Sequence, residues 1–187
     1  MILKRSSRNV ALLSVCQAFG QTQMILIFSV SSIIGATIAP NPGWATVPIT
    51  CQFIAMTGAT VPAALLMKKV GRARGFISFL GIGSFGAALM IYALFVPSFI
   101  LFCAGSALFG LSAGANQQFR FAAVDAADES FKSRAVSLVL AGGVFAALVG
   151  PYLSSLGYDM MRPILYGGVF AIILVMQGLM VVLLLCT

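Results

Sequence analysis

Long apolar stretches dominate the chain, and only short polar connections separate them. A helix needs roughly 20 apolar residues to span about 30 Å of hydrocarbon, because it rises about 1.5 Å per residue. We place six such spans at residues 10–37, 45–67, 75–95, 98–119, 135–156 and 163–186. A transmembrane barrel would show strands of about ten residues with alternating polarity, and the run 169–186 does not alternate. The pattern predicts an all-α integral membrane protein with six transmembrane helices.

The first apolar stretch has one alternative interpretation, a cleaved secretory signal. Lys4, Arg5 and Arg8 precede it, and the small residues Ala36 and Ala39 lie near its end. The apolar core of a signal peptide is about 7–15 residues long, and this stretch is longer. We therefore expect a retained first helix.

The basic residues gather in three connections that fall on one side of the six spans: Lys4, Arg5 and Arg8; Lys68, Lys69, Arg72 and Arg74; and Arg120, Lys132 and Arg134. The other side carries only Arg162, which lies beside Asp159. Because basic connections stay in the cytoplasm, the charges predict an N-in/C-in topology. We expect a bacterial inner (cytoplasmic) membrane protein with both termini cytoplasmic.

Composition supports the membrane assignment and narrows the partners. The chain is 60% hydrophobic and only 8% charged, whereas about a quarter of the residues of a soluble domain are charged. Its mean hydropathy is +1.07 and its net charge is +7. The positive charge is explained by topology, with anionic lipid headgroups as counterions. We therefore expect the lipid bilayer as a partner and no nucleic acid.

The four cysteines are Cys16, Cys51, Cys103 and Cys186, which are widely spaced and form no CxxC pair. The chain contains no His. These observations argue against a metal or cofactor site, which would need clustered Cys or His ligands. We interpret the cysteines as small residues in helix packing, and we expect no cofactor and no metal.

The six spans divide into two triplets near residue 97. The first triplet starts in the cytoplasm and the second starts outside, which is the arrangement of an inverted three-plus-three repeat. Residues 71–74 join the second and third spans, and residues 157–162 join the fifth and sixth. We therefore treat 1–187 as a single membrane domain with repeat halves of about 1–97 and 98–187.

The connection after the second span carries a recognisable pattern. Residues 69–74 read Lys-Val-Gly-Arg-Ala-Arg, which resembles the loop signature of the major facilitator superfamily. In this chain the signature residues are Lys68, Lys69, Gly71, Arg72 and Arg74. Further features that agree with the resemblance are Gly105, Gly110 and Gly114 on the fourth helix, the pair Lys132 and Arg134, and Gly142, Gly143, Gly150 and Pro151 on the fifth.

The resemblance covers the whole chain, as the N-terminal six-helix half of a family member that ordinarily has twelve helices. It implies transport of a small solute by alternating access, for which a half-length or truncated chain needs a second half or a second copy. The residues Gly142, Gly143, Gly150 and Pro151 would then serve helix packing or hinge motion.

Several positions depart from the family pattern. Ala64 and Lys68 stand where the loop signature places a Gly and an Asp, so we expect the acidic partner of the loop's charge network to be missing. Ser106 stands where the fourth helix often carries an Arg. Ser154 and Ser155 replace a Gly pair, although their small size still allows close backbone approach.

Polar side chains within the apolar spans are the candidate solute contacts, because such groups are costly in hydrocarbon. Ser14, Gln17 and Gln21 share one face of the first helix, which Met24 and Phe28 continue. A second stripe on the fourth helix contains Ser112, Asn116 and Arg120, with Gln117 and Gln118 beside it, and a thinner third stripe on the second helix contains Gln52, Thr57 and Thr60. We take Ser14, Gln17, Gln21, Asn116 and Gln117 as substrate-facing candidates. Interhelical hydrogen bonding is the structural alternative for the amides, and snorkelling to the headgroups is the alternative for Arg120.

The acidic residues Asp125, Asp128, Glu129 and Asp159 all fall in predicted loops. No span contains a carboxylate or a His, so this chain offers no membrane-buried group that titrates near neutral pH. No nucleophile has a visible base, and we expect no enzyme activity. We interpret the three clustered acids as a solvated loop balanced by Lys132 and Arg134.

Two functions remain open from the sequence. The first is a half-length transporter that works as a homo-oligomer or with a separate half. The second is a transport-inactive, transporter-derived structural or assembly subunit, which would bind heterologous membrane protein subunits through the Gly-rich face of the fifth helix.

Overall fold

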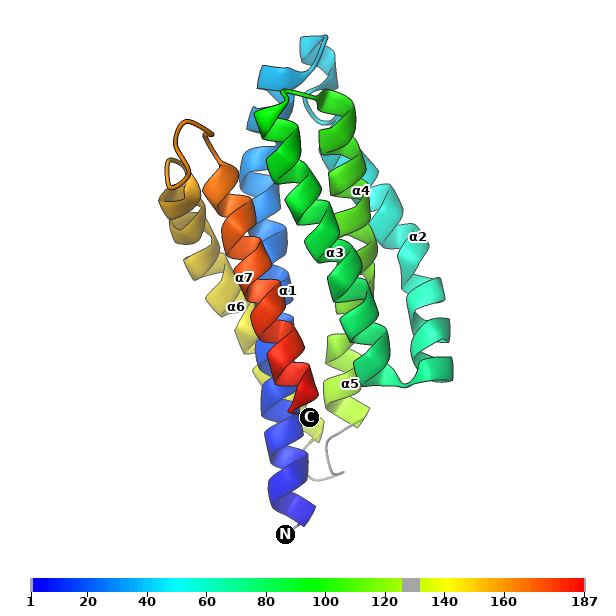
Figure 1. The fold of residues 1–187 in the computed structure, drawn as a ribbon. Coiled ribbons are helices and arrows are strands. Elements are labelled where there is room, and N and C mark those ends of the chain that lie inside the picture. The colour runs from blue at the N-terminus through cyan, green and yellow to red at the C-terminus, as the bar shows by residue number, and fades with distance from the viewer. Residues whose placement is uncertain (1, 126–131, 187) are drawn as a thin grey trace.

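The computed structural model describes residues 2–125 and 132–186, with side chains described at 8–125, 136–137 and 140–186. Its elements in chain order are α1 (Ile2–Ile38), the 3-10 helix η1 (Pro42–Trp44), α2 (Val47–Val70), α3 (Arg72–Phe95), α4 (Phe99–Asn116), α5 (Phe119–Asp125), α6 (Lys132–Gly157) and α7 (Gly167–Leu185). Six helical segments in this part of the chain are long and apolar enough to cross a membrane. No strand occurs in the residues described. The predicted six-span, all-α architecture is confirmed (Figure 1).

Asp128 and Glu129 lie outside the described residues, and so do the side chains of Lys4, Arg5, Lys132 and Arg134.

The predicted span at residues 98–119 falls within the observed span Phe99–Asp125, which a turn divides into two helices. Helix α4 ends at Asn116 and α5 begins at Phe119. The backbone N–H of Gln118 bonds to the carbonyl of Ala115, three residues back, at 2.9 Å. Its side chain donates to the carbonyl of Thr60 on α2 at 3.4 Å. A turn of polar residues therefore interrupts the helix within a stretch that is apolar on both sides.

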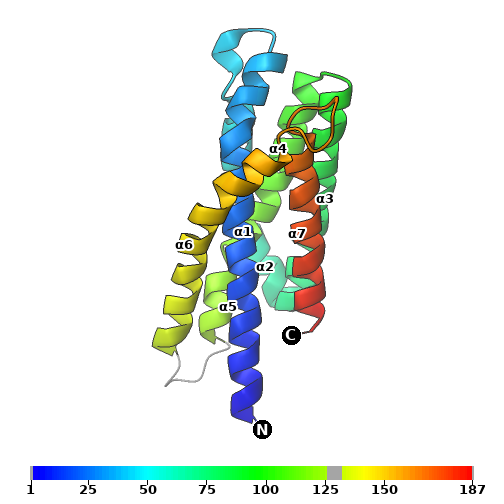
Figure 2. The same ribbon diagram turned by 90° about the vertical axis from the view of Figure 1, so that its left-hand side faces the viewer.

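The helices pair in a simple order. Helix α4 packs against both α2 and α3, α1 packs against α6, and α3 packs against α7. Figure 2 shows α3 and α7 on one side of the bundle and α5 and α6 on the other. The two chain ends lie at the same end of the bundle (Figure 1). The turns between α1 and α2, α3 and α4, and α6 and α7 lie at the opposite end.

Glycines bring α4 close to its neighbours. A Cβ added at Gly86 of α3 would lie 2.7 Å from the carbonyl oxygen of Gly105 and 2.8 Å from the backbone nitrogen of Phe109. A Cβ added at Gly114 would lie 2.5 Å from the carbonyl oxygen of Met56 on α2. Helix association in hydrocarbon depends on such close packing, because lipid tails are as apolar as Leu.

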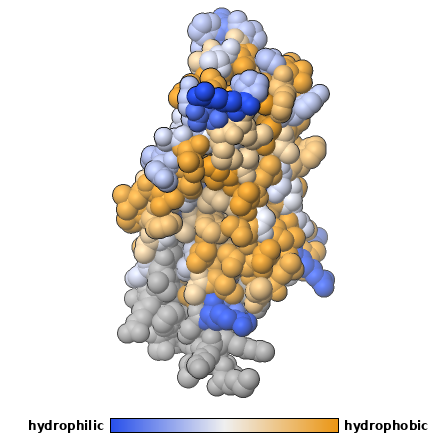
Figure 3. Space-filling view, turned by 60° about the vertical axis from the view of Figure 1, so that its left-hand side comes forward, coloured by the Kyte–Doolittle hydropathy of each residue, from blue (hydrophilic) through white to orange (hydrophobic). Residues whose placement is uncertain are grey.

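The buried apolar side chains form two clusters. One lies at the end that holds the chain termini and contains Leu13, Met67, Phe76 and Phe119. There the rings of Phe76 and Phe119 stack with centroids 3.9 Å apart and planes 9° apart. The other cluster, which includes Leu26, fills the rest of the bundle. The outer surface in Figure 3 is largely hydrophobic along the bundle, with hydrophilic residues gathered toward its ends, as expected for a protein solvated by lipid.

Candidate functional site

The polar stripe of α1 is mostly turned into the bundle. Ser14 and Gln17 are buried, and Gln21 is half-buried. The Ser14 hydroxyl and the Gln17 amide oxygen have no hydrogen-bond partner. Ser14 also lines a groove of about 410 Å³ between α1 and α6, together with Ala18, Gly142 and Phe145. The stripe therefore combines unpaired hydrogen-bonding capacity with a groove at one edge.

The second stripe meets the first across α4. Asn116 is buried against α1, where a Cβ added at Gly20 would lie 3.4 Å from its amide nitrogen. The Asn116 amide oxygen has no hydrogen-bond partner. Gln117, the next residue, is half-buried at the end of α4. The fold thus brings Asn116 against the helix that carries the α1 stripe, although the two stripes are about 100 positions apart in the sequence.

Gln52 of α2 adds a third amide on this side of α1. Its Nε2 donates to the sulfur of Met24 at 3.4 Å, whereas its Oε1 has no partner. The rings of Phe28 and Phe53 stack nearby with centroids 5.2 Å apart and also join α1 to α2. Gln17, Gln52 and Asn116 therefore each have a buried amide oxygen that lacks a donor, and they come from three different helices. A buried acceptor without a donor costs roughly 1–3 kcal/mol, so these oxygens favour a bound water or a donor-bearing ligand.

Sequence reasoning missed a buried polar network between α1, α3 and α7. Gln177 Nε2 donates to Gln23 Oε1 at 3.4 Å, and Ser84 Oγ donates to Gln177 Oε1 at 2.6 Å. Gln23 Nε2 also donates to the sulfur of Met180 at 3.4 Å. Both glutamine side chains are fully buried. Their arrangement is that of interhelical hydrogen bonds, and the signal that could have revealed it is the isolation of Gln177 in an otherwise apolar helix.

The turn between α2 and α3 depends on Gly71. Its φ of 92° and ψ of 153° place it in a region that is essentially restricted to glycine. Its N–H bonds to the carbonyl of Met67, and its own carbonyl accepts from Gly75, both at 3.0 Å. Gly71 therefore ends α2 and starts α3. The conformation of this single residue sets how the two helices, and the signature residues at their ends, are oriented relative to each other.

The expectation that the loop's charge network lacks an acid is wrong. The guanidinium of Arg72 donates to the carboxylate of Asp125, at the end of α5. Asp125 therefore lies at the end of a helix and not, as the sequence suggested, in a loop. The pair joins the α2–α3 turn to α5, 53 residues further along the chain. The side chain of Arg72 is 50% exposed and that of Asp125 is 61% exposed. We therefore expect the pair to contribute about 0–1 kcal/mol.

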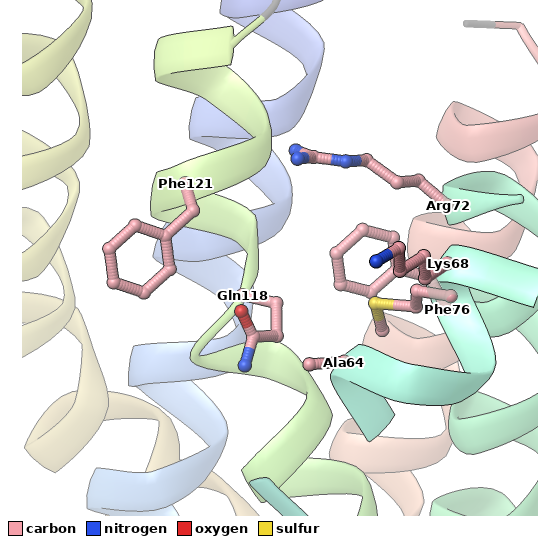
Figure 4. A pocket seen from close by; sticks show the side chains of 7 residues that line it. Ala64, Lys68, Arg72, Phe76, Gln118 and Phe121 are labelled. Carbon is pink, nitrogen blue, oxygen red and sulfur yellow. The ribbon is translucent and has the colours of Figure 1, made fainter. Parts of the chain in front are cut away.

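A pocket of about 300 Å³ adjoins this ion pair. It is lined by Ala64, Met67, Lys68, Arg72, Phe76, Gln118 and Phe121. Figure 4 shows that Lys68 and Arg72 enter from α2 and α3, while Gln118 and Phe121 face them from the other side. No carboxylate of the described residues pairs with Lys68.

The glycines of α6 differ in their surroundings. A Cβ added at Gly142 would lie 3.0 Å from the Cβ of Ala18 on α1, and one added at Gly150 would lie 2.6 Å from Cγ2 of Ile25. Gly143 has nothing within 4 Å of that position. Pro151 is exposed, and α6 continues through it to Gly157. Gly142 and Gly150 therefore lie at the contact between α1 and α6, whereas Gly143 and Pro151 are open.

In the part of the chain that the structure describes, the paired acidic and basic side chains lie at the two ends of the bundle. Asp125 lies at the end with the termini, and Asp159 pairs with Arg162 at 2.7 Å at the other end. The described residues contain no group of three or more His, Cys, Asp or Glu that could hold a metal ion. The central part of the bundle can therefore offer hydrogen bonds and apolar contacts, but no titratable carboxylate.

Comparison with known proteins places these features in a family context. No family model matches the chain. It is 31% identical over 163 residues to the riboflavin transporter RfnT of Brucella anthropi, a match that covers 87% of this chain and 41% of that protein. It is also similar to two uncharacterized MFS-type transporters of Bacillus subtilis, YdeG (25% identical over 146 residues) and YddS (27% over 150). Each of these two matches covers 78% of this chain and 34% of the relative. The chain spans about two fifths or less of the length of the curated relatives that it matches.

Proposed function

We propose that this chain, a six-helix relative of the major facilitator superfamily transporters, is one wall of a membrane protein that moves a small solute by alternating access. The observation that carries the proposal is the similarity to MFS-type transporters over most of the chain. A second six-helix bundle, either another copy or a separate half, would supply the opposite wall.

The helix pairing supports an inverted repeat. The first helix of the first triplet, α1, packs against α6, the second helix of the second triplet. Reciprocally, α4 packs against α2. In both cases the first helix of one triplet packs against the second helix of the other, as expected for two triplets of opposite orientation. The shared end of both termini and the basic residues near it support cytoplasmic termini in an inner membrane.

The solute-contacting surface that we propose is formed by Ser14, Gln17 and Gln21 of α1 together with Asn116 and Gln117 of α4. The unpartnered amide oxygens of Gln17 and Asn116 would accept hydrogen bonds from the solute. Because the described residues place no carboxylate in the central part of the bundle, an uncharged solute fits this surface better than a cation. Riboflavin is the first solute to test, because one of the relatives is a riboflavin transporter. Riboflavin is uncharged and rich in hydrogen-bond donors.

The experiment is uptake of labelled riboflavin into proteoliposomes that contain the purified oligomer. We expect saturable uptake that falls in Gln17→Leu, because this change removes the hydrogen-bonding amide and keeps a side chain of similar size. Ser29→Ala is the matched control, since Ser29 is exposed and bonds only to the carbonyl of Ile25 in its own helix. An oligomer that transports neither riboflavin nor any other solute tested would contradict the proposal.

The second candidate is a structural or assembly subunit that no longer transports. It is favoured by the exposed apolar faces of α2 and α6, which include Ile54, Val61, Leu140 and Leu148 and which foreign helices could cover. Native mass measurement after gentle purification separates the candidates. A homodimer favours transport, whereas a stoichiometric complex with other membrane proteins favours the structural role.

A further inference from the structure

The pocket beside the α2–α3 turn carries positive charge that its surroundings do not neutralise. Arg72 uses one guanidinium nitrogen for Asp125. A guanidinium has five N–H donors, so others remain for a ligand. The ammonium group of Lys68 has no carboxylate partner among the described residues, and Figure 4 shows it beside the same opening. The pocket can therefore present two cationic groups to one anion.

The wider charge balance at this end points the same way. Lys69 and Arg74 flank the pocket residues in the sequence and are exposed, and Arg120 lies next to Phe121 in α5. Against these cations, Asp125 is the acid that the described residues place here. Basic clusters at the cytoplasmic face of a membrane attract anionic lipids, at about 1 kcal/mol for each Lys or Arg near the surface.

An apolar groove continues from the pocket. Phe121 lines the pocket and also a neighbouring groove of about 340 Å³ between α5 and α6. Val124, Val136 and Leu140 line that groove, and Arg120 lies at it with its guanidinium carbon 4.8 Å from the centroid of the Phe121 ring. A free anion would gain nothing from the apolar side chains of this groove, whereas an acyl chain would bury them.

We propose that the pocket of Lys68 and Arg72 binds the phosphate of an anionic phospholipid, whose acyl chain lies along the groove of Phe121, Val124 and Leu140. Gln118 supplies a neutral polar group at the pocket wall. The site requires only that the chain is embedded in a bilayer. It does not depend on transport, so its test and the uptake test fail independently.

The first test compares two single-charge variants of the full chain in nanodiscs of phosphatidylcholine with added phosphatidylglycerol. Lys68→Ala removes a pocket cation, and Lys69→Ala removes an adjacent exposed cation that does not line the pocket. Both variants lose the same net charge, so diffuse attraction falls equally. We expect the affinity for phosphatidylglycerol, measured by native mass spectrometry, to fall about five-fold in Lys68→Ala and to change less than about two-fold in Lys69→Ala.

Three outcomes would overturn the proposal. Equal losses in the two variants would show that diffuse charge rather than the pocket holds the lipid. Equal retention of phosphatidylcholine and phosphatidylglycerol by the parent chain would show that the site does not select negative charge. Displacement of the lipid by excess inorganic phosphate would identify a site for a free anion.

The second test addresses the acyl chain and does not disturb the cations. Phe121→Ala shortens the apolar groove, and Phe85→Ala, at an exposed position of α3, is its control. We expect weaker retention of phosphatidylglycerol only in Phe121→Ala, with unchanged helix content by circular dichroism. Retention equal to that of the parent chain would show that no acyl chain lies in the groove.

Discussion

The closest approach between α3 and α4 gives the sharpest test of the packing. Gly86→Ala adds a single methyl group that would lie 2.7 Å from the carbonyl oxygen of Gly105 and 2.8 Å from the backbone nitrogen of Phe109. Ordinary contacts begin near 3.4 Å, so α3 and α4 must separate by more than half an ångström. Both obstructing atoms belong to the backbone and cannot rotate away. We therefore expect a loss of about 1–3 kcal/mol, the usual cost of overpacking.

The assay is reversible unfolding in mixed micelles with increasing sodium dodecyl sulfate, followed by circular dichroism. Gly81→Ala is the control, because it makes the same chemical change in the same helix and a Cβ there meets nothing within 4 Å. The control should be neutral or stabilised, since Ala has a higher helix propensity than Gly by about 1 kcal/mol. The reasoning is refuted if Gly86→Ala is as stable as the parent chain, or if Gly81→Ala loses as much.

Three further predictions concern the polar network, the α2–α3 turn and the topology. Gln177→Leu should lower the free energy of unfolding by about 0.6–1.7 kcal/mol in the same assay, because the buried Gln23 and the half-buried Ser84 lose their hydrogen bonds to it; no change would mean that these bonds contribute nothing. Gly71→Ala should cost about 1–3 kcal/mol, since alanine is strained at a φ of 92°, and Ala73→Gly in the next turn should not reproduce that backbone strain. In intact cells, an impermeant maleimide should label Gly43→Cys in η1 but not the exposed Cys186, and the reverse pattern would invert the proposed orientation.

The sequence predicted the spans well, because twenty or so consecutive apolar residues have few alternatives to a membrane helix. It could not predict the break after Asn116, because hydrophobicity continues into α5 and the turn depends on a contact between Gln118 and the carbonyl of Thr60. The network of Gln23 and Gln177 was missed for a related reason. Helical spacing shows which residues share a face of one helix, but not which other helix that face meets.

The ion pair of Arg72 with Asp125 escaped prediction because its partners are 53 residues apart, and the family pattern directed attention to position 68. The absence of an acid at position 68 does not exclude an acid from another helix, and in the folded chain Asp125 of α5 lies beside Arg72. The search for candidate solute contacts had a similar limit. The periodicity placed Ser14 and Gln17 on a common face, whereas their burial and their unpartnered oxygens became visible only in the packed bundle.

The position of α5 is set by packing rather than by its ion pair. The stacked rings of Phe76 and Phe119 are fully buried, and such a pair contributes about 0.5–1.5 kcal/mol beyond the area that it buries. The exposed pair of Arg72 with Asp125 contributes about 0–1 kcal/mol and weakens in salt. We therefore expect Phe119→Ala to cost about 3–5 kcal/mol in the micelle assay and Asp125→Asn to cost less than 1 kcal/mol.

This difference bears on how the pocket could work. If the ion pair is weak and α5 stays in place without it, Arg72 can leave Asp125 for a lipid phosphate at little cost to the fold. Asp125→Asn should then strengthen phosphatidylglycerol retention, because it removes the negative charge that competes with the phosphate for Arg72. Weaker retention in Asp125→Asn, with α5 intact, would mean that the carboxylate positions Arg72 for the lipid instead of competing with it.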